Sequence, residues 1–371
     1  MFTLRFDMRA PASGAPASSL YPAALDMAEW AETRGLILLV VSEHHAAEDG
    51  FLPSPLPMAA ALAARTKSVS IAVSALILPL YNPVRLAEDI GVLDHLSGGR
   101  ISYTLGIGYR PEEFESVGVE YHCRGALADE HLDVLLKALG GERFEFDGRE
   151  VLVRPAPEGK VRISYGGGTV QAARRAARFG LGFNAQNDRP ELAQAYHDEC
   201  ARLGHLPGRI QQPRPGFPTT VFVADDVDRA WAEIGPYLLH DAISYAGGHH
   251  DPYVVSLSRA TTVDALRAEN GSHRIYTVEQ AIDAIARDGI LSLHPLCGGL
   301  PPEIAWTYLR RVVDEVLSRR DSVDGTATWT SMSSLPVVTN TCKVWGSVIT
   351  KSRNPSTTCR DCGRSRTVTM A

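Results

Sequence analysis

The fold of this chain can be worked out from one segment, Leu36-Ile37-Leu38-Leu39-Val40-Val41-Ser42-Glu43-His44-His45. Its first six residues are an unbroken apolar run that begins just after Gly35 and ends at a polar residue. A short Leu/Ile/Val run bounded in this way is typical of a strand buried on both faces, as in a parallel sheet. The acidic residue and the two histidines therefore follow the carboxyl end of a strand. In parallel α/β barrels this end carries the active site.

Strand and helix patterns alternate on both sides of this segment. Each candidate strand is followed by an amphipathic helical pattern. Besides the run at 36–41, the strands are expected at residues 3–7, 69–78, 101–107, 161–165, 181–184, 219–223 and 290–294. Eight such units over about 320 residues are typical of one closed barrel. An open doubly wound sheet is the alternative, but the chain lacks a dinucleotide-binding fingerprint. We predict an α/β protein with a single (β/α)8 TIM barrel over residues 1–320.

Two regions depart from this repeat. Residues 237–275 form an insertion before the eighth strand, and insertions of this length usually serve a function. We expect this one to be a lid or a pocket wall. Residues 321–371 are rich in Ser, Thr and Val and lack helical periodicity, which predicts a poorly ordered tail. The tail contains a CxxC pair, Cys359 and Cys362, but too few ligands for structural zinc, so we attribute the pair to chance.

Composition excludes several classes of function. The chain has 371 residues and a formal net charge of −6 at pH 7, which gives no reason to expect nucleic acid or an acidic membrane surface as partner. No apolar run approaches the roughly 20 residues that span a bilayer, and the N-terminus does not resemble a secretory signal. Six thinly spread cysteines do not form a disulfide framework. We therefore expect a cytoplasmic protein with no nucleic-acid or membrane partner.

Glu43, His44 and His45 are the strongest candidates for catalysis. A carboxylate beside two imidazoles is poorly suited to packing and well suited to proton transfer. The structural alternative is a helix cap or a buried histidine bonded to backbone. Metal binding is disfavoured, because adjacent residues of an extended chain point to opposite sides and no third ligand has a suitable spacing. We predict a catalytic group and no metal.

Two glycine-containing turns are candidates for ligand binding. Gly166-Gly167-Gly168-Thr169 lies between a strand and a helix, where free backbone N–H groups attract an anion such as phosphate. A tight turn without a ligand would use the same glycines. Gly108-Tyr109-Arg110 follows the fourth strand, and these side chains could contact a ring or a phosphate. They could equally pack, with Arg110 paired to Glu112 or Glu113.

With these residues in view, the chain resembles the bacterial luciferase-like family of flavin-dependent monooxygenases. The resemblance covers about residues 1–320. It is carried by Glu43-His44-His45, by Ser97-Gly98-Gly99-Arg100 and by several longer stretches. Those stretches are residues 78–89, 93–100, 109–114, 166–184 and 294–302.

The resemblance implies a cofactor and a place for it. Such proteins hold reduced FMN at the carboxyl mouth of the barrel, where it reacts with O2 to form a peroxyflavin that oxidises a small organic substrate. The flavin phosphate would lie at Gly166, Gly167, Gly168 and Thr169, and Glu43 and His44 would lie near the ring. The family often has a cis peptide that corresponds here to Ser74-Ala75.

One departure concerns the phosphate. Relatives commonly have a loop about two residues longer before the segment that corresponds to Tyr109-Arg110. In some of them an arginine in that loop contacts the phosphate. Here Gly108 leads directly into Tyr109. Either Arg110 takes over this contact or phosphate is bound less tightly.

Taken together, we expect His44 to be a general base and Glu43 to orient it or to polarise the flavin. The reduced flavin would come from a separate reductase, and a homodimer is possible within this family. A deazaflavin coenzyme on the same barrel is the nearest alternative. A non-catalytic flavin-binding protein is a further one. A metal-dependent barrel hydrolase would need ligands spread over several strand ends, which we do not find.

Overall fold

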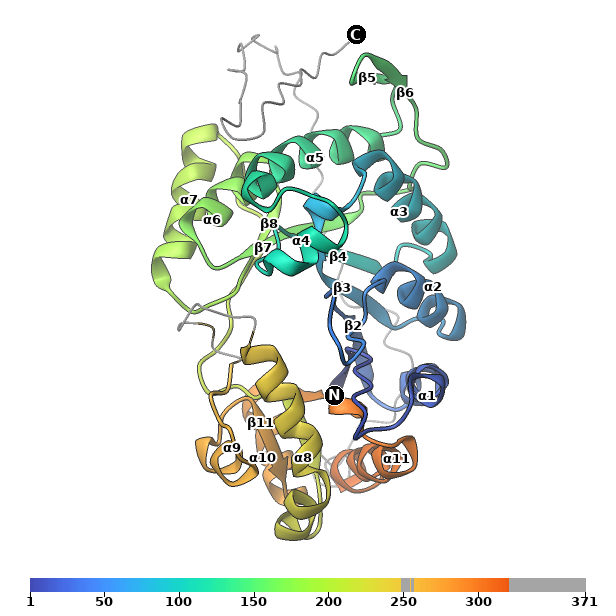
Figure 1. The fold of residues 1–371 in the computed structure, drawn as a ribbon, viewed down its shortest axis with the longest axis vertical. Helices are drawn as coiled ribbons and strands as arrows, with labels where there is room; N and C mark the ends of the chain where they lie inside the picture. Colours follow the sequence, from blue (N-terminus) through green and yellow to red (C-terminus); the bar gives the residue numbers. More distant parts are fainter. Residues whose placement is uncertain (248–253, 255–256, 320–371) are drawn as a thin grey trace.

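The structure is a computed structural model that describes residues 1–247, 254 and 257–319 (Figure 1). The expected tail at 321–371, with its cysteine pair, lies outside the described residues. The same holds for the glycine- and histidine-rich part of the expected insertion, residues 248–251. No helix of the described chain is both long and apolar enough to cross a membrane.

The eight expected strands are all present and all run parallel. They are β1 (Phe2–Phe6), β2 (Leu36–Val41), β3 (Ser70–Ile77), β4 (Ile101–Gly106), β7 (Arg162–Gly167), β8 (Gly182–Ala185), β10 (Thr220–Val223) and β12 (Leu291–Leu293). Two short strands, β9 (Ile210–Gln211) and β11 (His273–Tyr276), pair with β8 and β10. The hydrogen-bonded order is β11-β10-β12-β1-β2-β3-β4-β7-β8-β9. The sheet thus follows the chain order of a barrel.

Eight helices alternate with these strands and form the outer layer. They are α1 (Ala17–Glu32), α2 (Pro55–Arg65), α3 (Pro83–Ser97), α5 (Arg124–Leu139), α6 (Val170–Arg178), α7 (Pro190–Leu203), α10 (Val278–Asp288) and α11 (Pro302–Arg311). Consecutive helices pack side by side: α1 on α2, α2 on α3, α3 on α5, and α6 on α7, while α11 returns to α1 (Figure 1). The predicted (β/α)8 TIM barrel is confirmed.

Local sequence explains where the helices begin and end. Asn82 caps α3 by accepting hydrogen bonds from two backbone N–H groups, and Gly98 ends this helix in the left-handed conformation that favours glycine. Thr277 and Gln280 form a reciprocal capping box at the start of α10. Short elements lie in the connections: η1 (Leu78–Leu80), α4 (Pro111–Ser116), η2 (Tyr121–Cys123), the hairpin β5 (Phe144–Phe146) and β6 (Arg149–Val151), η3 (Cys297–Gly299) and the π-helical turn η4 (Val312–Leu317).

The insertion differs from its predicted bounds. It begins at Val227, because α8 (Val227–Ala246) runs unbroken through residue 237 and packs on η3, β11 and the following helix α9 (Val263–Glu269) rather than on α7. The backbones of α8 and η3 are very close, since a Cβ on Gly298 would lie 2.1 Å from the carbonyl oxygen of Tyr237. As η3 follows the carboxyl end of β12, α8 is held at the mouth of the barrel.

Candidate active site

The catalytic segment and the glycine turn leave the same end of the barrel. Val41 of β2 pairs with Val73 of β3, which pairs with Tyr103 of β4, which pairs with Ile163 of β7. Glu43 lies two residues beyond this level, and the glycine turn begins three residues beyond it. Three strand spacings separate them, or about 14 Å along the wall.

Glu43 is almost completely buried and is bound from three directions. Its Oε2 accepts a hydrogen bond from the backbone N–H of Ile77 at 2.7 Å. Its Oε1 accepts one from the Tyr81 hydroxyl at 2.7 Å and lies 2.8 Å from Nε2 of His45. The hydrogen bond between Glu43 and His45 raises the pKa of His45 and outweighs the opposing effect of burial. The charges of Glu43 and Glu113 raise this pKa further.

His44 is bound by a different carboxylate. Its Nδ1 lies 2.7 Å from Oε1 of Glu113, a fully buried residue in the first turn of α4. Its Nε2 lies 3.3 Å from the hydroxyl of Tyr109. The two histidine rings therefore diverge, as expected for neighbours in an extended chain.

The expected partner of His44 was wrong. We expected Glu43 either to orient this imidazole or to polarise the flavin. The first role is wrong, because Glu43 binds His45, Tyr81 and backbone, and Glu113 takes that place. From the sequence, Glu113 is expected only as a possible ion-pair partner of Arg110. The chain brings it to His44 across 69 residues of sequence, through the position of α4 after β4. No local pattern distinguishes it from its neighbour Glu112.

The other residues of this loop have clear structural roles. Arg110 pairs with Glu112 at 2.8 Å, which agrees with the alternative that this side chain forms an ion pair within the loop. Gly108 has φ +73°, and a Cβ there would lie 2.7 Å from Ile77 and 2.8 Å from Phe114, so this position requires glycine. The Ser74-Ala75 peptide in β3 is cis, as the family resemblance implied.

The glycine turn fits an anion but is also explained by packing. A Cβ on Gly167 would lie 2.6 Å from that of Ala172, and one on Gly166 would lie 3.0 Å from Thr104. Thr169 caps α6, since its hydroxyl oxygen accepts from the Ala172 N–H at 3.2 Å. The hydroxyl proton is free to donate elsewhere. Together with the N-terminus of α6, these residues suit a phosphate group, and Gly168 lies between them.

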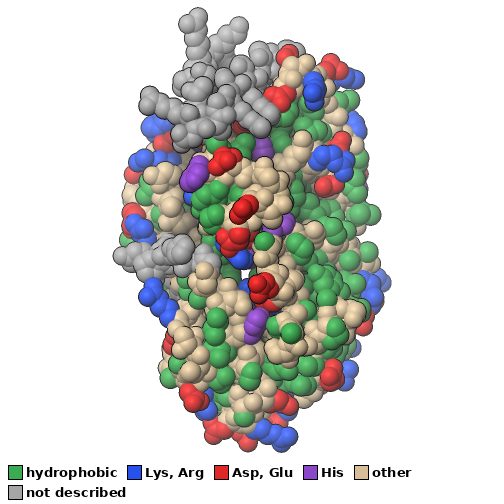
Figure 2. Space-filling view, in the orientation of Figure 1, with side chains coloured by type: hydrophobic (Ala, Val, Ile, Leu, Met, Phe, Trp, Pro, Cys, Tyr) green, Lys and Arg blue, Asp and Glu red, His purple; other side chains and the backbone are tan. Residues whose placement is uncertain are grey.

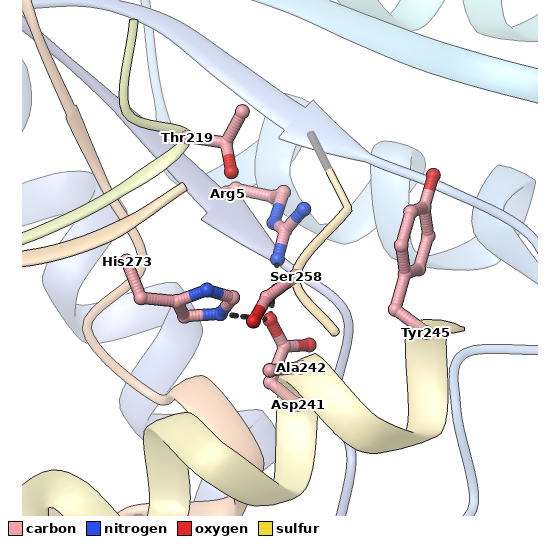
Figure 3. Close-up of a pocket in the computed structure, with 7 residues that line it drawn as sticks. All are labelled: Arg5, Thr219, Asp241, Ala242, Tyr245, Ser258 and His273. Carbon is pink, nitrogen blue, oxygen red and sulfur yellow. Dashed lines mark hydrogen bonds and ion pairs between the residues drawn. The ribbon is translucent and has the colours of Figure 1, made fainter. Parts of the chain in front are cut away.

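A buried network of charges lies beside this site and was not predicted (Figure 3). Oδ2 of Asp241, in α8, accepts a hydrogen bond from Nη2 of Arg5 at 3.2 Å and lies 2.9 Å from Nε2 of His273. Burial alone would raise the pKa of Asp241, but Arg5 and His273 hold it well below its usual range. These residues line a small pocket with hydroxyl and phenol groups. The full lining is Arg5, Thr219, Asp241, Ala242, Tyr245, Ser258 and His273.

Helix α8 also contacts the loop that follows β2. His240 lies 2.8 Å from Asp49, which follows β2 and also binds Arg9. These partners overcome the effect of burial and lower the pKa of Asp49 to about 2. The ring of Tyr245 lies 6.4 Å from that of His44. Part of the expected insertion therefore does form a wall of the site, as helix rather than loop. Figure 2 shows a narrow opening near the middle of the viewed face, with charged side chains around it.

One buried group within the described residues has metal-ligand side chains: Asp241, His294 and Cys297. Arg5 lies 3.2 Å from Asp241 and 3.0 Å from Nδ1 of His294, so a guanidinium already supplies the positive charge there. Burial raises the pKa of the Cys297 thiol, which opposes the thiolate form that metals prefer. The donor set does not suit a metal ion.

A protein-family model described as luciferase-like monooxygenase matches residues 4–299 of the chain. Among curated proteins, an uncharacterized protein of Sinorhizobium fredii is 34% identical over 131 residues, which is 35% of this chain and 37% of that protein. The match thus spans little more than a third of this relative. The 4-hydroxyprotoasukamycin monooxygenase of Streptomyces nodosus subsp. asukaensis is 26% identical over 312 residues, 81% of this chain and 72% of the relative.

Solved structures show the same fold. Monooxygenase RslO1 of Streptomyces bottropensis superposes with a TM-score of 0.66 at 21% identity, covering 86% of this chain and 100% of that one. The oxygenating constituent of 3,6-diketocamphane monooxygenase from Pseudomonas putida, in complex with FMN, gives 0.59 at 18%, covering 86% and 98%. An F420-dependent secondary alcohol dehydrogenase with an F420-acetone adduct gives 0.59 at 16%, covering 82% and 97%.

Proposed function

Because the chain belongs to the luciferase-like monooxygenase family, we propose that it binds reduced FMN at the mouth of its barrel and uses O2 to oxidise a small organic substrate. Bound reduced FMN would supply the electrons that activate O2. The observation that carries the proposal is a buried, carboxylate-bound histidine at the same barrel end as a phosphate-compatible turn.

The residues of the chain divide the work as follows. Thr169, with Gly166, Gly167 and Gly168, would hold the phosphate at the N-terminus of α6. Ser74 and Ala75 of β3, with Gly108 and Tyr109, would line the ring site between β2 and β7, in keeping with the strand order. Arg110 is engaged by Glu112, so we expect it to contribute little to phosphate affinity.

His44 would act as the general base that accepts a proton during the reaction. Histidine is the usual general base at neutral pH, because the ordinary pKa of an imidazole lies near 6.5. Phe51 and Tyr245 of α8 pack edge-to-face near the His44 ring, which would limit the access of water to the site. His45 and Glu43 would set the shape of the loop, because their mutual hydrogen bond ties it to η1 through Tyr81.

The deazaflavin alternative is supported by one structural neighbour, the F420-dependent dehydrogenase. Both cofactors would present a phosphate chain to the same turn. Anaerobic titration of the purified protein with FMN, reduced FMN and the deazaflavin coenzyme would give the affinity for each. Free reduced FMN reacts with O2 without any protein, so the rate of O2 consumption must be compared with that of the free flavin. A rate that the protein changes, together with no O2 consumption with the deazaflavin, would support the oxygenase. We also propose that a separate reductase supplies the flavin.

The first prediction tests the role of His44. We expect His44→Ala to bind reduced FMN with unchanged affinity and to lose at least about 10²-fold in turnover, the low end for acid–base catalysis. Turnover would be followed as the rate of product formation per enzyme. His95→Ala, at a half-exposed histidine of α3, is the control and should turn over normally. Turnover of His44→Ala within a few-fold of wild type would refute the assignment.

A further inference from the structure

His44 is held by side chains from several parts of the chain. Its ring makes edge-to-face contacts with Phe51 and Tyr109, at centroid distances of 4.7 and 5.6 Å, and with Tyr245 of α8. Its two nitrogens face chemically different partners, the Glu113 carboxylate at 2.7 Å and the Tyr109 hydroxyl at 3.3 Å. The ring therefore has an acidic end and a hydroxyl end, and it cannot turn freely between them.

The carboxylate selects the nitrogen that carries the proton. An ionised carboxylate only accepts hydrogen bonds, so the contact with Glu113 requires a proton on Nδ1 of His44. The backbone N–H of His45 donates to the same oxygen at 3.2 Å, which further orients the carboxylate. Neutral His44 then keeps its lone pair on Nε2, the nitrogen that faces Tyr109.

Glu113 is poorly explained as a purely structural residue. It is fully buried, and its Oε2 has no hydrogen-bond partner among the described residues. A buried carboxylate oxygen without a partner weakens folding. The charged neighbours do not compensate for it, because Arg110 pairs with Glu112. Arg9 lies over the Phe51 ring and pairs with Asp49.

We infer that Glu113 is a positioning residue that holds His44 in the Nδ1–H form, so that Nε2 accepts the proton and the Tyr109 hydroxyl is its first exchange partner. The proton of an acidic substrate group passes to the Tyr109 oxygen while the proton of Tyr109 passes to Nε2. The resulting imidazolium is balanced by the Glu113 carboxylate. Burial raises the pKa of Tyr109, so this hydroxyl gives up its proton only as it receives one. The catalytic part of this inference rests on the proposed function.

The tautomer can be observed without any turnover. We expect ¹⁵N NMR of the histidine-labelled full chain to show His44 protonated on Nδ1 at pH 8, assigned by its loss in His44→Ala. In Glu113→Gln, whose amide can either donate or accept, this preference should be reduced to a mixture. A His44 protonated on Nε2 in the wild-type protein would overturn the inference, whatever the activity.

Steady-state kinetics test whether the position of the His44 proton affects turnover. We expect Glu113→Gln to lower kcat about 10²-fold, as loss of a histidine-orienting partner commonly does, with KM and FMN affinity within threefold. Losing the negative charge disfavours the imidazolium, so the acid limb of the kcat profile should move to lower pH. Glu115→Gln, at an exposed residue of the same short helix, should leave kcat and the limb unchanged.

The outcomes separate the two proposals. An unchanged kcat and pH profile in a folded Glu113→Gln would overturn the positioning role. If Glu113→Gln fails to fold, Glu113→Asp should keep the Nδ1–H form with a smaller loss of kcat, and an Nε2–H form there would count against the inference. If wild-type protein leaves the oxidation of reduced FMN by O2 at the rate of free flavin, the proposed function fails while the tautomer measurement still decides the role of Glu113.

Discussion

At the scale of residues, the two adjacent histidines differ because each meets its own carboxylate. His44 turns toward Glu113 and His45 toward Glu43, both of which are fully buried at the side chain. Charge-assisted hydrogen bonds of this kind are roughly twice as strong as neutral ones. A loop that would otherwise be mobile is thereby held in one conformation at the barrel mouth.

His45 predicts a pH dependence of stability. Its pKa is raised in the folded protein above the ordinary value of 6.5. The stabilisation by the Glu43–His45 pair is therefore fully present below about pH 6.5 and is lost as pH rises through the folded pKa. Urea unfolding between pH 5.5 and 8.5 should show wild type more stable than His45→Gln at the acid end, with the difference shrinking toward pH 8.5. The prediction fails if the difference is constant or grows with pH.

At the scale of elements, the Thr169 hydroxyl at the start of α6 has two roles. Thr169 accepts a hydrogen bond from the helix backbone, and under the proposed function it also donates to a phosphate oxygen. Thr262 caps α9 in the same way, far from the glycine turn in sequence. The chain thus provides a matched pair of threonine caps.

Replacing each cap by isosteric valine separates the two tasks. We expect Thr169→Val and Thr262→Val each to lower the free energy of unfolding by about 1 kcal/mol. Only Thr169→Val should weaken FMN binding, while affinity for riboflavin, which has no phosphate, should stay unchanged in both. Fluorescence titration with the two flavins measures this. Equal losses for FMN and riboflavin would place the phosphate elsewhere.

At the scale of the whole molecule, buried charges tie together a part of the barrel where strand pairing is thin. β10 and β12 share a single paired register position, Val221 with Leu293. Asp241 joins α8 to Arg5 of β1 and His273 of β11 across this region. The pair with Arg5 spans 236 residues of sequence, so it forms only when the two ends of the barrel meet, whereas the pair with His273 spans 32.

Breaking this junction should weaken the whole fold. Asp241→Asn removes the buried carboxylate that both Arg5 and His273 contact, and we expect a loss of about 3–5 kcal/mol in the free energy of unfolding. Asp228→Asn, at an exposed ion pair on the same helix, should cost less than about 1 kcal/mol. Denaturant unfolding monitored by fluorescence and circular dichroism would measure both. Similar values for the two variants would show that the junction is not a stabilising feature.

Much of the fold could be predicted from local pattern. The apolar runs, the glycines that end helices and the caps at Asn82 and Thr277 mark eight strand–helix units, and the structure confirms them. The placement of Glu43 to His45 and of Gly166 to Thr169 at one barrel end also follows, because all strands of a parallel barrel point the same way. The bounds of α8 were missed, since an amphipathic helix can face the outer layer or the mouth with the same periodicity.

Periodicity and turn chemistry are properties of neighbouring residues, and the order of amino acids therefore specified the barrel and the rim on which its chemistry lies. The side chains that contact these rim residues reach them only in the folded barrel. Glu113 meets His44, His240 meets Asp49, and Arg5 meets Asp241 because loops and helices distant in sequence converge at the mouth. Many carboxylates in the chain could satisfy a histidine equally well. Packing of the barrel wall brings one of them within 2.7 Å of His44 and leaves the others elsewhere.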